Sequence, residues 1–311
     1  MPVSGSMQDR SVLLLATNKK EYLQFALNCA QSIKLHNPDL QIFIATNIAV
    51  KKTISGITFL SVSEDLAKLY IEAKIYLDSF LQTQETLFID SDCLCYGNLE
   101  PLFKACRGMD VTVVGRPVPL ESYWGTEHSE FARKEFGIDK SIVFNGGFYY
   151  FKKSALTKSI FDKAREISSR YDEYGFHRIK NKWKNEEELL SIGMVVNKQT
   201  PIADNGTYMT DLYTNHRPAT LNVLTGAREL RNPAYPVVEP RSWYPAAYSP
   251  ILLHFGGSSL KSYPYVSQSA LLRLHNLGLP VPLASALVYV FIDTPFKTYY
   301  WFKKIAGAKR Q

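Results

Sequence analysis

Short apolar runs alternate with longer stretches of helical periodicity along the first third of the chain. Four apolar runs of strand length lie at residues 11–16, 41–46, 57–60 and 85–90. Apolar residues at helical spacing predict one helix over about 21–36, which ends at Asn37-Pro38, and another over 66–77. Strands that alternate with helices predict an α/β fold whose mostly parallel sheet is covered on both faces.

The middle of the chain combines two further strands with two long irregular segments. Residues 111–114 and 142–151 predict strands, and the second is interrupted by two glycines, which often marks a close approach to the backbone. Residues 115–141 and 200–250 predict loop-rich segments. Long irregular segments in a compact domain are often lids or binding loops. We therefore expect these two to bind a ligand.

The run at 85–90 ends in two carboxylates one residue apart, Asp90 and Asp92. If the strand continues through them, alternation places both on one side and Ser91 on the other. Two like charges held together repel unless a cation lies between them, and a hard divalent ion is the natural partner. The alternative is a strand that ends in a polar Asp-Ser-Asp turn.

Further motifs accompany these carboxylates in a fixed order. They are Lys74 upstream and, downstream, Phe144-Asn145-Gly146-Gly147, Asn185-Glu186-Glu187-Glu188-Leu189-Leu190 and His254-Phe255-Gly256-Gly257. In order and spacing, from about Val12 to Lys261, the chain resembles glycosyltransferase family 8, which includes glycogenin and bacterial lipooligosaccharide galactosyltransferases. The resemblance implies the A-type glycosyltransferase fold, with a Rossmann-like mixed, mostly parallel sheet.

The same resemblance implies an activity. It is that of a metal-dependent, retaining glycosyltransferase that moves a hexose of glucose or galactose type. The donor would be a UDP-sugar and the acceptor a glycan or a lipid-linked glycan. The two loop-rich segments would then bind the acceptor.

The expected nucleotide end follows the first strand. Thr17 or Asn18 could cap the next helix, and Tyr22 could pack in the core. The resemblance instead implies that this Thr-Asn…Tyr arrangement, with Ala16 before it, lines a uracil pocket. Lys74 matches a family position that reaches the donor's phosphate and sugar, whereas its alternative is an exposed helix lysine.

The implied metal site uses Asp90 and Asp92 together with His254. A lone histidine after an apolar run is usually a packed core residue, but His254 matches the third metal ligand of the family. Nitrogen ligands favour first-row transition ions, so Mn²⁺ suits this set better than Mg²⁺, which remains the alternative. The ion would neutralise charge on the departing nucleotide. Gly257 and Lys261 would contact the donor, with Lys261 one residue later than in the family.

The catalytic residues are implied by the acidic run at 186–188, which replaces the family's Asp-Gln-Asp. Sugar transfer passes through an oxocarbenium-like state that needs negative charge near the anomeric carbon. We expect Glu186 on sugar hydroxyls and Glu187 beneath the anomeric carbon, while Glu188 stays a candidate for either role. The alternative is a solvated helix start. The full donor-binding set is Ala16, Thr17, Asn18, Tyr22, Lys74, Asp90, Ser91, Asp92, Asn145, Gly146, Gly257 and Lys261; Asn145 could instead cap a turn.

Composition sets the expected domain organisation. The chain has 311 residues and 46% hydrophobic content, enough for a buried core. We expect a disordered segment at 1–10, a catalytic domain at 11–265 and a helical, membrane-surface-associating segment at 266–311. No signal peptide is visible at the start, so a cytoplasmic protein is expected. The four cysteines lack zinc spacing, and Cys93 and Cys95 are expected to be reduced, packed thiols.

The last segment mixes aromatic and basic residues. Residues 281–292 form an uncharged, apolar stretch that is too short to span a bilayer. The aromatics and lysines of 296–304, followed by Lys309 and Arg310, fit a segment in the interface of an anionic membrane. The net charge of +7 agrees with peripheral attachment to a membrane inner surface. The alternative is a terminal helix docked on the domain. No nucleic-acid recognition motif accompanies the basic residues.

Two other classes of protein share parts of this pattern. A phosphatase of the haloacid dehalogenase type also ends a strand with Asp-x-Asp, but near the start of the chain and with later paired aspartates. A catalytically silent sugar-nucleotide binder or scaffold would be expected to lose Asp90, Asp92 or His254. All three are present.

Overall fold

The structure, a computed structural model, describes residues 9–50, 54–176, 178–212, 217–232 and 243–308. The expected disordered segment at 1–10 therefore lies mostly outside the described residues, as do Lys309 and Arg310.

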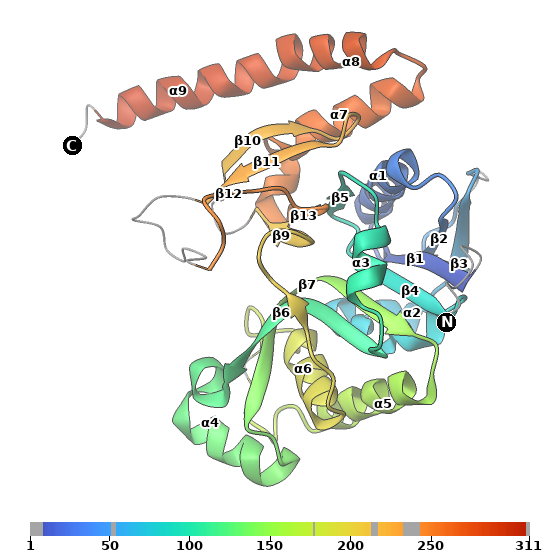
Figure 1. Ribbon diagram of the computed structural model, residues 1–311, viewed down its shortest axis with the longest axis vertical. Helices are drawn as coiled ribbons and strands as arrows, with labels where there is room; N and C mark the ends of the chain where they lie inside the picture. The colour runs from blue at the N-terminus through green and yellow to red at the C-terminus, as the bar shows by residue number, and fades with distance from the viewer. Residues whose placement is uncertain (1–8, 51–53, 177, 213–216, 233–242, 309–311) are drawn as a thin grey trace.

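A seven-stranded sheet forms the centre of the molecule (Figure 1). Its strand order is β3 (Ile57–Ser61), β2 (Gln41–Thr46), β1 (Arg10–Leu15), β4 (Glu85–Ile89), β7 (Lys140–Lys152), β6 (Val111–Pro119) and β8 (Ile202–Ala203). The first four strands are parallel. β7 runs antiparallel to both β4 and β6, and β8 is parallel to β6. The sheet is thus mixed and mostly parallel, as predicted.

Both faces of this sheet are buried, which explains the uninterrupted apolar runs in the sequence. Along β1, Val12 and Leu14 enter one core while Leu13 and Leu15 enter the other. The first core lies under α1 (Lys20–His36) and α3 (Glu100–Ala105). The second lies under α5 (Ala155–Ser169) and α6 (Glu186–Val196).

The segment around Lys74 is helical but is not the continuous α-helix predicted for 66–77. It divides into a short α2 (Glu64–Ala67), capped by Ser63, and a 3₁₀ helix, η2 (Tyr70–Phe80). The division falls at Tyr70, whose φ of 54° does not fit a right-handed helix. Arg165 of α5 holds η2 in place by donating to Asp78 at 2.7 and 3.0 Å.

The prediction of a loop-rich segment at 115–141 was wrong. β6 continues to Pro119, and a 17-residue helix follows, α4 (Leu120–Phe136). Pro117 and Pro119 obscure this strand in the sequence. They are tolerated because β8 pairs only with Val114 and Gly115, so that the later part of β6 is an edge.

The segment at 200–250 contains several short strands rather than loop alone; its residues 213–216 and 233–242 lie outside the described residues. β9 (Met209–Asp211) joins a small sheet of order β5-β13-β9, with β5 (Cys93–Cys95) and β13 (Leu252–His254). β10 (Arg217–Asn222), β11 (Ala227–Arg231) and β12 (Ala247–Tyr248) form another. The β5–β13 pairing sets His254 opposite Cys93, so it brings the end of the chain to the Asp-Ser-Asp motif.

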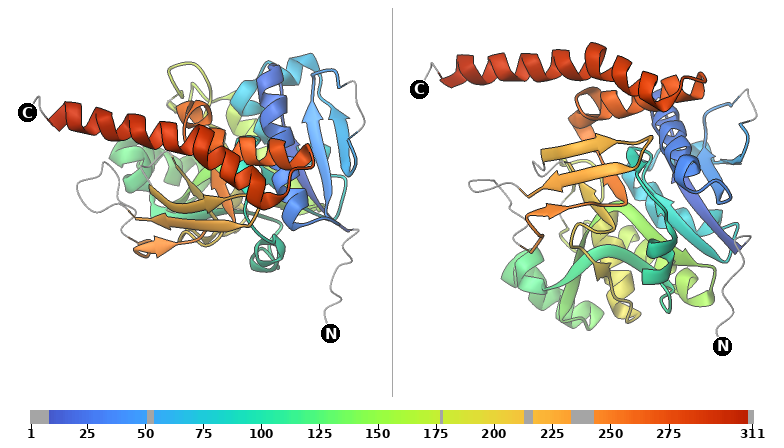
Figure 2. Two further views of the ribbon diagram at one scale, coloured as in Figure 1. Left: turned by 90° about the horizontal axis from the view of Figure 1, so that it is seen from above. Right: turned by 45° about the horizontal axis from the view of Figure 1, so that its top comes forward.

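The C-terminal part is helical, as predicted. After the 3₁₀ turn η3 (Gly257–Lys261), α7 (Tyr265–Asn276) packs on α1, where Tyr265 accepts a hydrogen bond from Asn28 at 3.2 Å. α8 (Val281–Val288), the π-helical turn η4 (Tyr289–Asp293) and α9 (Thr294–Ala308) follow as one long helical arm that runs past the body of the molecule (Figure 2). Within the described residues, no helix has the length and apolar character needed to cross a membrane.

Candidate active site

The Asp-Ser-Asp motif forms a turn, not a continuing strand. β4 ends at Ile89, and the Cys93 amide closes the turn by donating to the Asp90 carbonyl at 3.0 Å. The prediction that strand alternation aligns the two carboxylates was therefore wrong. Asp90 Oδ2 lies 2.8 Å from Lys74 Nζ, while Asp92 Oδ1 lies 2.9 Å from His254 Nε2.

Lys74 is a buried cation at the centre of the site. Its side chain is 12% exposed, and Nζ lies 2.8 Å from Asp90, 3.2 Å from Glu186 and 3.0 Å from the Gly146 carbonyl oxygen. Burial acts to lower the pKa of Lys74, but Asp90 and Glu186 outweigh it and raise that pKa well above its ordinary value. The alternative of an exposed helix lysine does not hold.

The two glycines of β7 lie where the strand bulges away from β6. Gly115 pairs with Phe144 and Val113 pairs with Tyr149, so four residues of β7 lie opposite one of β6. A Cβ at Gly146 would lie 2.8 Å from Glu186 Oε1, and a Cβ at Gly147 would lie 3.0 Å from His254 Nδ1. Only glycine lets these side chains come so close to the backbone.

Asn145 fixes the orientation of His254. The Gly147 amide donates to Asn145 Oδ1 at 2.9 Å, which identifies this atom as the carbonyl oxygen. His254 Nδ1 lies 2.7 Å from the same oxygen and must therefore be the donor. His254 Nε2 is left to face Asp92. Burial acts to lower the pKa of His254, but Asp92 outweighs it and raises that pKa to about 9.

Three candidate metal-ligating atoms lie together where His254 faces Asp92. Atoms of Asp92, Cys93 and His254 lie within 4.8 Å of one another, and this set does not include Asp90. Asp92 Oδ1 is buried and accepts no hydrogen bond with acceptable geometry from the described residues, although it lies close to His254 Nε2. Burial and the nearby Asp92 raise the pKa of the Cys93 thiol well above its ordinary value, so it is a protonated, packed thiol as predicted.

The three consecutive glutamates have three different partners. Asn185 caps α6 by accepting from the Glu187 amide at 3.1 Å. Glu186 contacts Lys74, and Glu187 Oε1 accepts from the Gly146 amide at 2.6 Å. Glu188 points to the core and accepts from the Tyr171 hydroxyl at 2.9 Å. The run is therefore no solvated helix start, and only Glu186 and Glu187 face the site.

Burial has a strong effect on two of these carboxyl groups. Burial, followed by the neighbouring Glu186, raises the pKa of Glu187 to about 7. Burial also raises the pKa of Glu188 to about 7, against the opposing effect of its hydrogen bonds to Tyr171 and Asn185. A carboxyl that titrates near neutrality beside a buried lysine is typical of a functional site.

A cavity of about 250 Å³ opens beside Lys74. Seven of the predicted donor-binding residues line it: Thr17, Asn18, Tyr22, Lys74, Asp90, Ser91 and Asp92. Neither Thr17 nor Asn18 caps α1, whose N-cap is Lys19. Asn18 has a φ of 71° and donates from its side chain to the Ala67 carbonyl at 2.8 Å, which ties it to the end of α2.

The other predicted donor-binding residues lie outside this cavity. Ala16 is buried, and its amide donates to Ala45. Gly257 is exposed at the start of η3, and the Lys261 side chain is 77% exposed, 3.7 Å from Glu21. Asn145 and Gly146 lie at the β7 bulge between Lys74 and His254.

Two tyrosines at this site were not predicted from the sequence. Tyr70 lines the cavity and is held there by the left-handed turn between α2 and η2. Tyr149 lies near Gly146, and its buried hydroxyl has no hydrogen-bond partner among the described residues. A positive φ at Tyr70 leaves no mark in the sequence. Tyr149 sits only two residues from Gly147, in a strand whose burial conceals it.

Comparison with known proteins finds similarity in structure alone. No family model and no curated protein matches the chain. An active-site mutant of the galactosyltransferase LgtC superposes over 88% of this chain and 99% of its own, at 15% identity and a TM-score of 0.51. The glycosyltransferase GlyE of Streptococcus pneumoniae TIGR4 is 16% identical with a TM-score of 0.42. The match covers 63% of this chain and 45% of the GlyE chain. Mouse xyloside xylosyltransferase 1 is 12% identical with a TM-score of 0.43, over 66% of this chain and 88% of that one.

The likeness to LgtC extends over nearly the whole of both chains and therefore defines the fold. This protein has a family 8-like fold of the A-type glycosyltransferase class, as the resemblance predicted. At 15% identity the likeness concerns the fold alone.

The contact between Asp92 and His254 predicts the titration of the metal-free protein. His254 should titrate near pH 9, because the Asp92 carboxylate stabilises its charged form. Asp92→Asn should lower that pKa, because burial and the nearby Lys74 then oppose the charged form and only Asp90 still favours it. NMR of the imidazole resonances measures both values, with His254→Ala providing the assignment.

The same shift fixes the sign of a stability effect. The folded-state pKa lies above the unfolded value, so the stabilisation is complete below about pH 6.5 and is lost as the pH rises to about 9. A wild-type His254 that titrates at or below its ordinary value would contradict the assigned contact.

Proposed function

We propose that this protein is a glycosyltransferase that moves a hexose from a UDP-sugar to a glycan or lipid-linked acceptor, with retention of configuration. One observation carries the proposal. A buried lysine, two carboxylates from α6 and the Asp92–His254 pair meet around the two β7 glycines, beside a cavity at the carboxyl ends of β1 and β4. That edge of the sheet is where open α/β folds hold their ligands.

The cavity is assigned to the nucleotide. Thr17, Asn18 and Tyr22 would hold the uracil, and the exposed face of Tyr22 offers a surface for stacking. Lys74 and the Asp-Ser-Asp turn, which also line the cavity, would lie against the diphosphate. The buried amine supplies a fixed positive charge there, because Asp90 and Glu186 keep it protonated.

The donor set fits a divalent cation. Asp92 Oδ1 is a buried acceptor without a hydrogen bond, and the hydrogen bond from His254 Nδ1 to Asn145 leaves Nε2 as the ligating nitrogen. Asp92 and His254 would hold the ion, with Asp90 available once it separates from Lys74. Nitrogen and oxygen ligands together favour Mn²⁺, with Mg²⁺ as the alternative. A bound ion would neutralise charge on the departing diphosphate.

Glu187 is assigned to the anomeric carbon and Glu186 to the sugar hydroxyls. Glu187 Oε1 is fixed by the Gly146 amide, so its other oxygen is free to face the sugar. An ionised carboxylate at this place stabilises the positive charge of an oxocarbenium-like state. The unpartnered hydroxyl of Tyr149 is suited to bind a sugar hydroxyl beside Gly146.

A metal-binding prediction follows from the Asp92–His254 pair. Asp92→Asn or His254→Ala should abolish Mn²⁺-dependent binding of UDP while leaving the fold intact, because each removes a ligand. Isothermal titration with and without Mn²⁺ measures the effect. Asp65→Asn removes an exposed carboxylate of α2 and should behave as wild type. Full transferase activity after exhaustive chelation would contradict the assignment.

A second prediction separates the glutamates. Glu187→Gln keeps the shape but removes the charge, so it should lower kcat roughly 10²–10³-fold with little change in donor affinity. Glu188→Gln should retain kcat, because Glu188 accepts a hydrogen bond from Tyr171 in the core and does not face the site. Steady-state kinetics with each UDP-sugar compares the two. Equal kcat values would refute the role of Glu187. UDP-sugar binding without turnover in the wild type would instead favour the silent sugar-nucleotide binder.

We propose that α9 binds a membrane surface, at the cytoplasmic face expected from the sequence. Ala284 and Val288 of α8 are buried, so α8 docks on the body, which agrees with the alternative of a docked terminal helix for this part of the arm. In α9 the four consecutive aromatic side chains of residues 299–302 are exposed; Trp301 is 59% and Tyr299 61% exposed. Aromatics and lysines on one exposed helix suit the headgroup layer of an anionic membrane.

This assignment predicts the effect of removing α9. A chain that ends at Asp293 keeps the docked α8 and should lose binding to anionic liposomes while it still hydrolyses the donor. Each basic residue near such a surface contributes on the order of 1 kcal/mol, so binding should also weaken with salt. Cosedimentation measures it, with neutral liposomes as the control. Unchanged cosedimentation of the shortened chain would contradict the assignment.

A further inference from the structure

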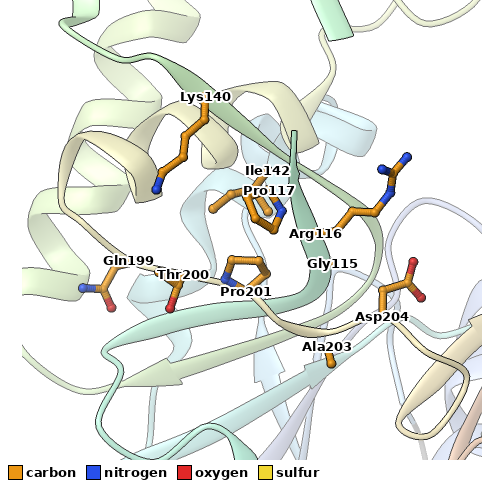
Figure 3. Close-up of a pocket in the computed structure, with 10 residues that line it drawn as sticks. All are labelled: Gly115, Arg116, Pro117, Lys140, Ile142, Gln199, Thr200, Pro201, Ala203 and Asp204. Atoms are coloured by element: carbon orange, nitrogen blue, oxygen red, sulfur yellow. The ribbon is translucent and has the colours of Figure 1, made fainter. Parts of the chain in front are cut away.

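A second cavity, of about 440 Å³, lies between the β6–β7 pair and β8 (Figure 3). Residues 115–117 of β6 and Lys140 and Ile142 of β7 form one side, and residues 199–201, 203 and 204 around β8 form the other. The two segments expected to bind the acceptor, 115–141 and 200–250, therefore meet at this cavity. It shares no lining residue with the nucleotide cavity.

The middle of the cavity is apolar and its two ends are polar. Pro117, Ile142 and Pro201 lie in the middle, with Lys140 at one end and Arg116 at the other (Figure 3). The volume is within the range of roughly 300–1,000 Å³ found for small-molecule sites. Apolar walls of this kind suit the C–H face of a sugar ring.

The charge of the cavity is positive. Among the described residues, neither Lys140 nor Arg116 forms an ion pair with a carboxylate. The one acidic lining residue, Asp204, is engaged by its neighbours. Its carboxylate accepts from the Tyr244 hydroxyl, and its carbonyl oxygen accepts from Trp243 Nε1 at 2.8 Å. Two cations that pair with no carboxylate of the described residues attract an anion.

Trp243 fixes one of these cations in place. The Arg116 guanidinium carbon lies 4.3 Å from the centroid of the Trp243 ring. The hydrogen bond to Asp204 anchors that ring, although it is 44% exposed. Stacking on an aromatic face orders the guanidinium and leaves its N–H groups free for a planar anionic group such as a carboxylate.

The cavity lies close to the proposed sugar-transfer site. Ile142 of the cavity and Gly146, which contacts Glu187, are four residues apart on β7. Even a fully extended chain spans no more than about 14 Å over four residues. An oligosaccharide that has its terminal sugar at Glu187 is long enough to reach the cavity with a sugar farther along the chain.

We propose that this cavity is an acceptor subsite for an acidic sugar, one that bears a carboxylate or a phosphate. Lys140 and Arg116 bind the anionic group, and Pro117, Ile142 and Pro201 contact the ring. The assignment of the bound sugar to an acceptor rests on the proposed glycosyltransferase activity. The preference for an anionic sugar rests on the cavity itself.

The test measures binding of four monosaccharides to the full chain without donor. Methyl glucuronide, methyl galacturonide and glucose 6-phosphate carry a charge, and methyl glucoside is the neutral reference. Binding is followed through the Ile142 methyl resonance in ¹³C-methyl NMR. At least one acidic sugar should bind at least tenfold more tightly than methyl glucoside, and the uronides and the phosphate separate the two kinds of anion.

Two charge reversals on the same strand complete the test. Lys140→Glu should weaken binding of that acidic sugar at least tenfold. Lys152→Glu, which makes the same change at the exposed other end of β7, should alter it less than twofold. Equal losses in both variants would indicate general surface charge, and equal binding of the neutral sugar, or binding of none, would overturn the proposal. Absence of transferase activity in the wild type would contradict the proposed function but leave this binding result unaffected.

Discussion

The buried amine of Lys74 is the contact on which the rest of the site depends. It joins Asp90 after β4, Glu186 at the start of α6 and the Gly146 carbonyl of β7. These groups come from separate parts of the chain. Without the cation, the carboxylates of Asp90 and Glu186 would repel each other. Removing one partner from a buried ion pair costs about 3–5 kcal/mol, because the remaining charge is left without compensation. Lys74 thus holds three elements together and also sets the charge of the site.

The short segment 145–147 links the two halves of this site. On one side, the Asn145 carbonyl oxygen receives the His254 Nδ1–H, which directs Nε2 toward Asp92. On the other side, the Gly146 amide holds Glu187. A shift of this segment would therefore move both the histidine and the glutamate. Such coupling explains why two glycines are needed, since a Cβ at either position would meet these side chains at 3.1 Å or less.

Much of the fold could be predicted because the main strands are buried on both faces. β1, β2 and β4 are short apolar runs with no other interpretation, and α1 has clear periodicity. The prediction failed where tertiary contacts decide the structure. α4 follows a strand that contains two prolines, which are acceptable only because that part of β6 is an edge. The break at Tyr70 and the turn at Asp90 depend on backbone angles and on partners far away in the sequence.

The sequence also identified most of the residues that meet at the site, but not which partner each one has. Asp90 belongs with Lys74 rather than with Asp92, and this follows only from the turn between β4 and β5. The acidic run is a different case. Successive residues of a helix point about 100° apart, so three neighbouring side chains cannot all face one site. Because Asn185 caps α6, the first turn places Glu186 and Glu187 toward β7 and turns Glu188 to Tyr171. The cap, rather than the identity of the acidic residues, decides which two carboxylates face the β7 glycines.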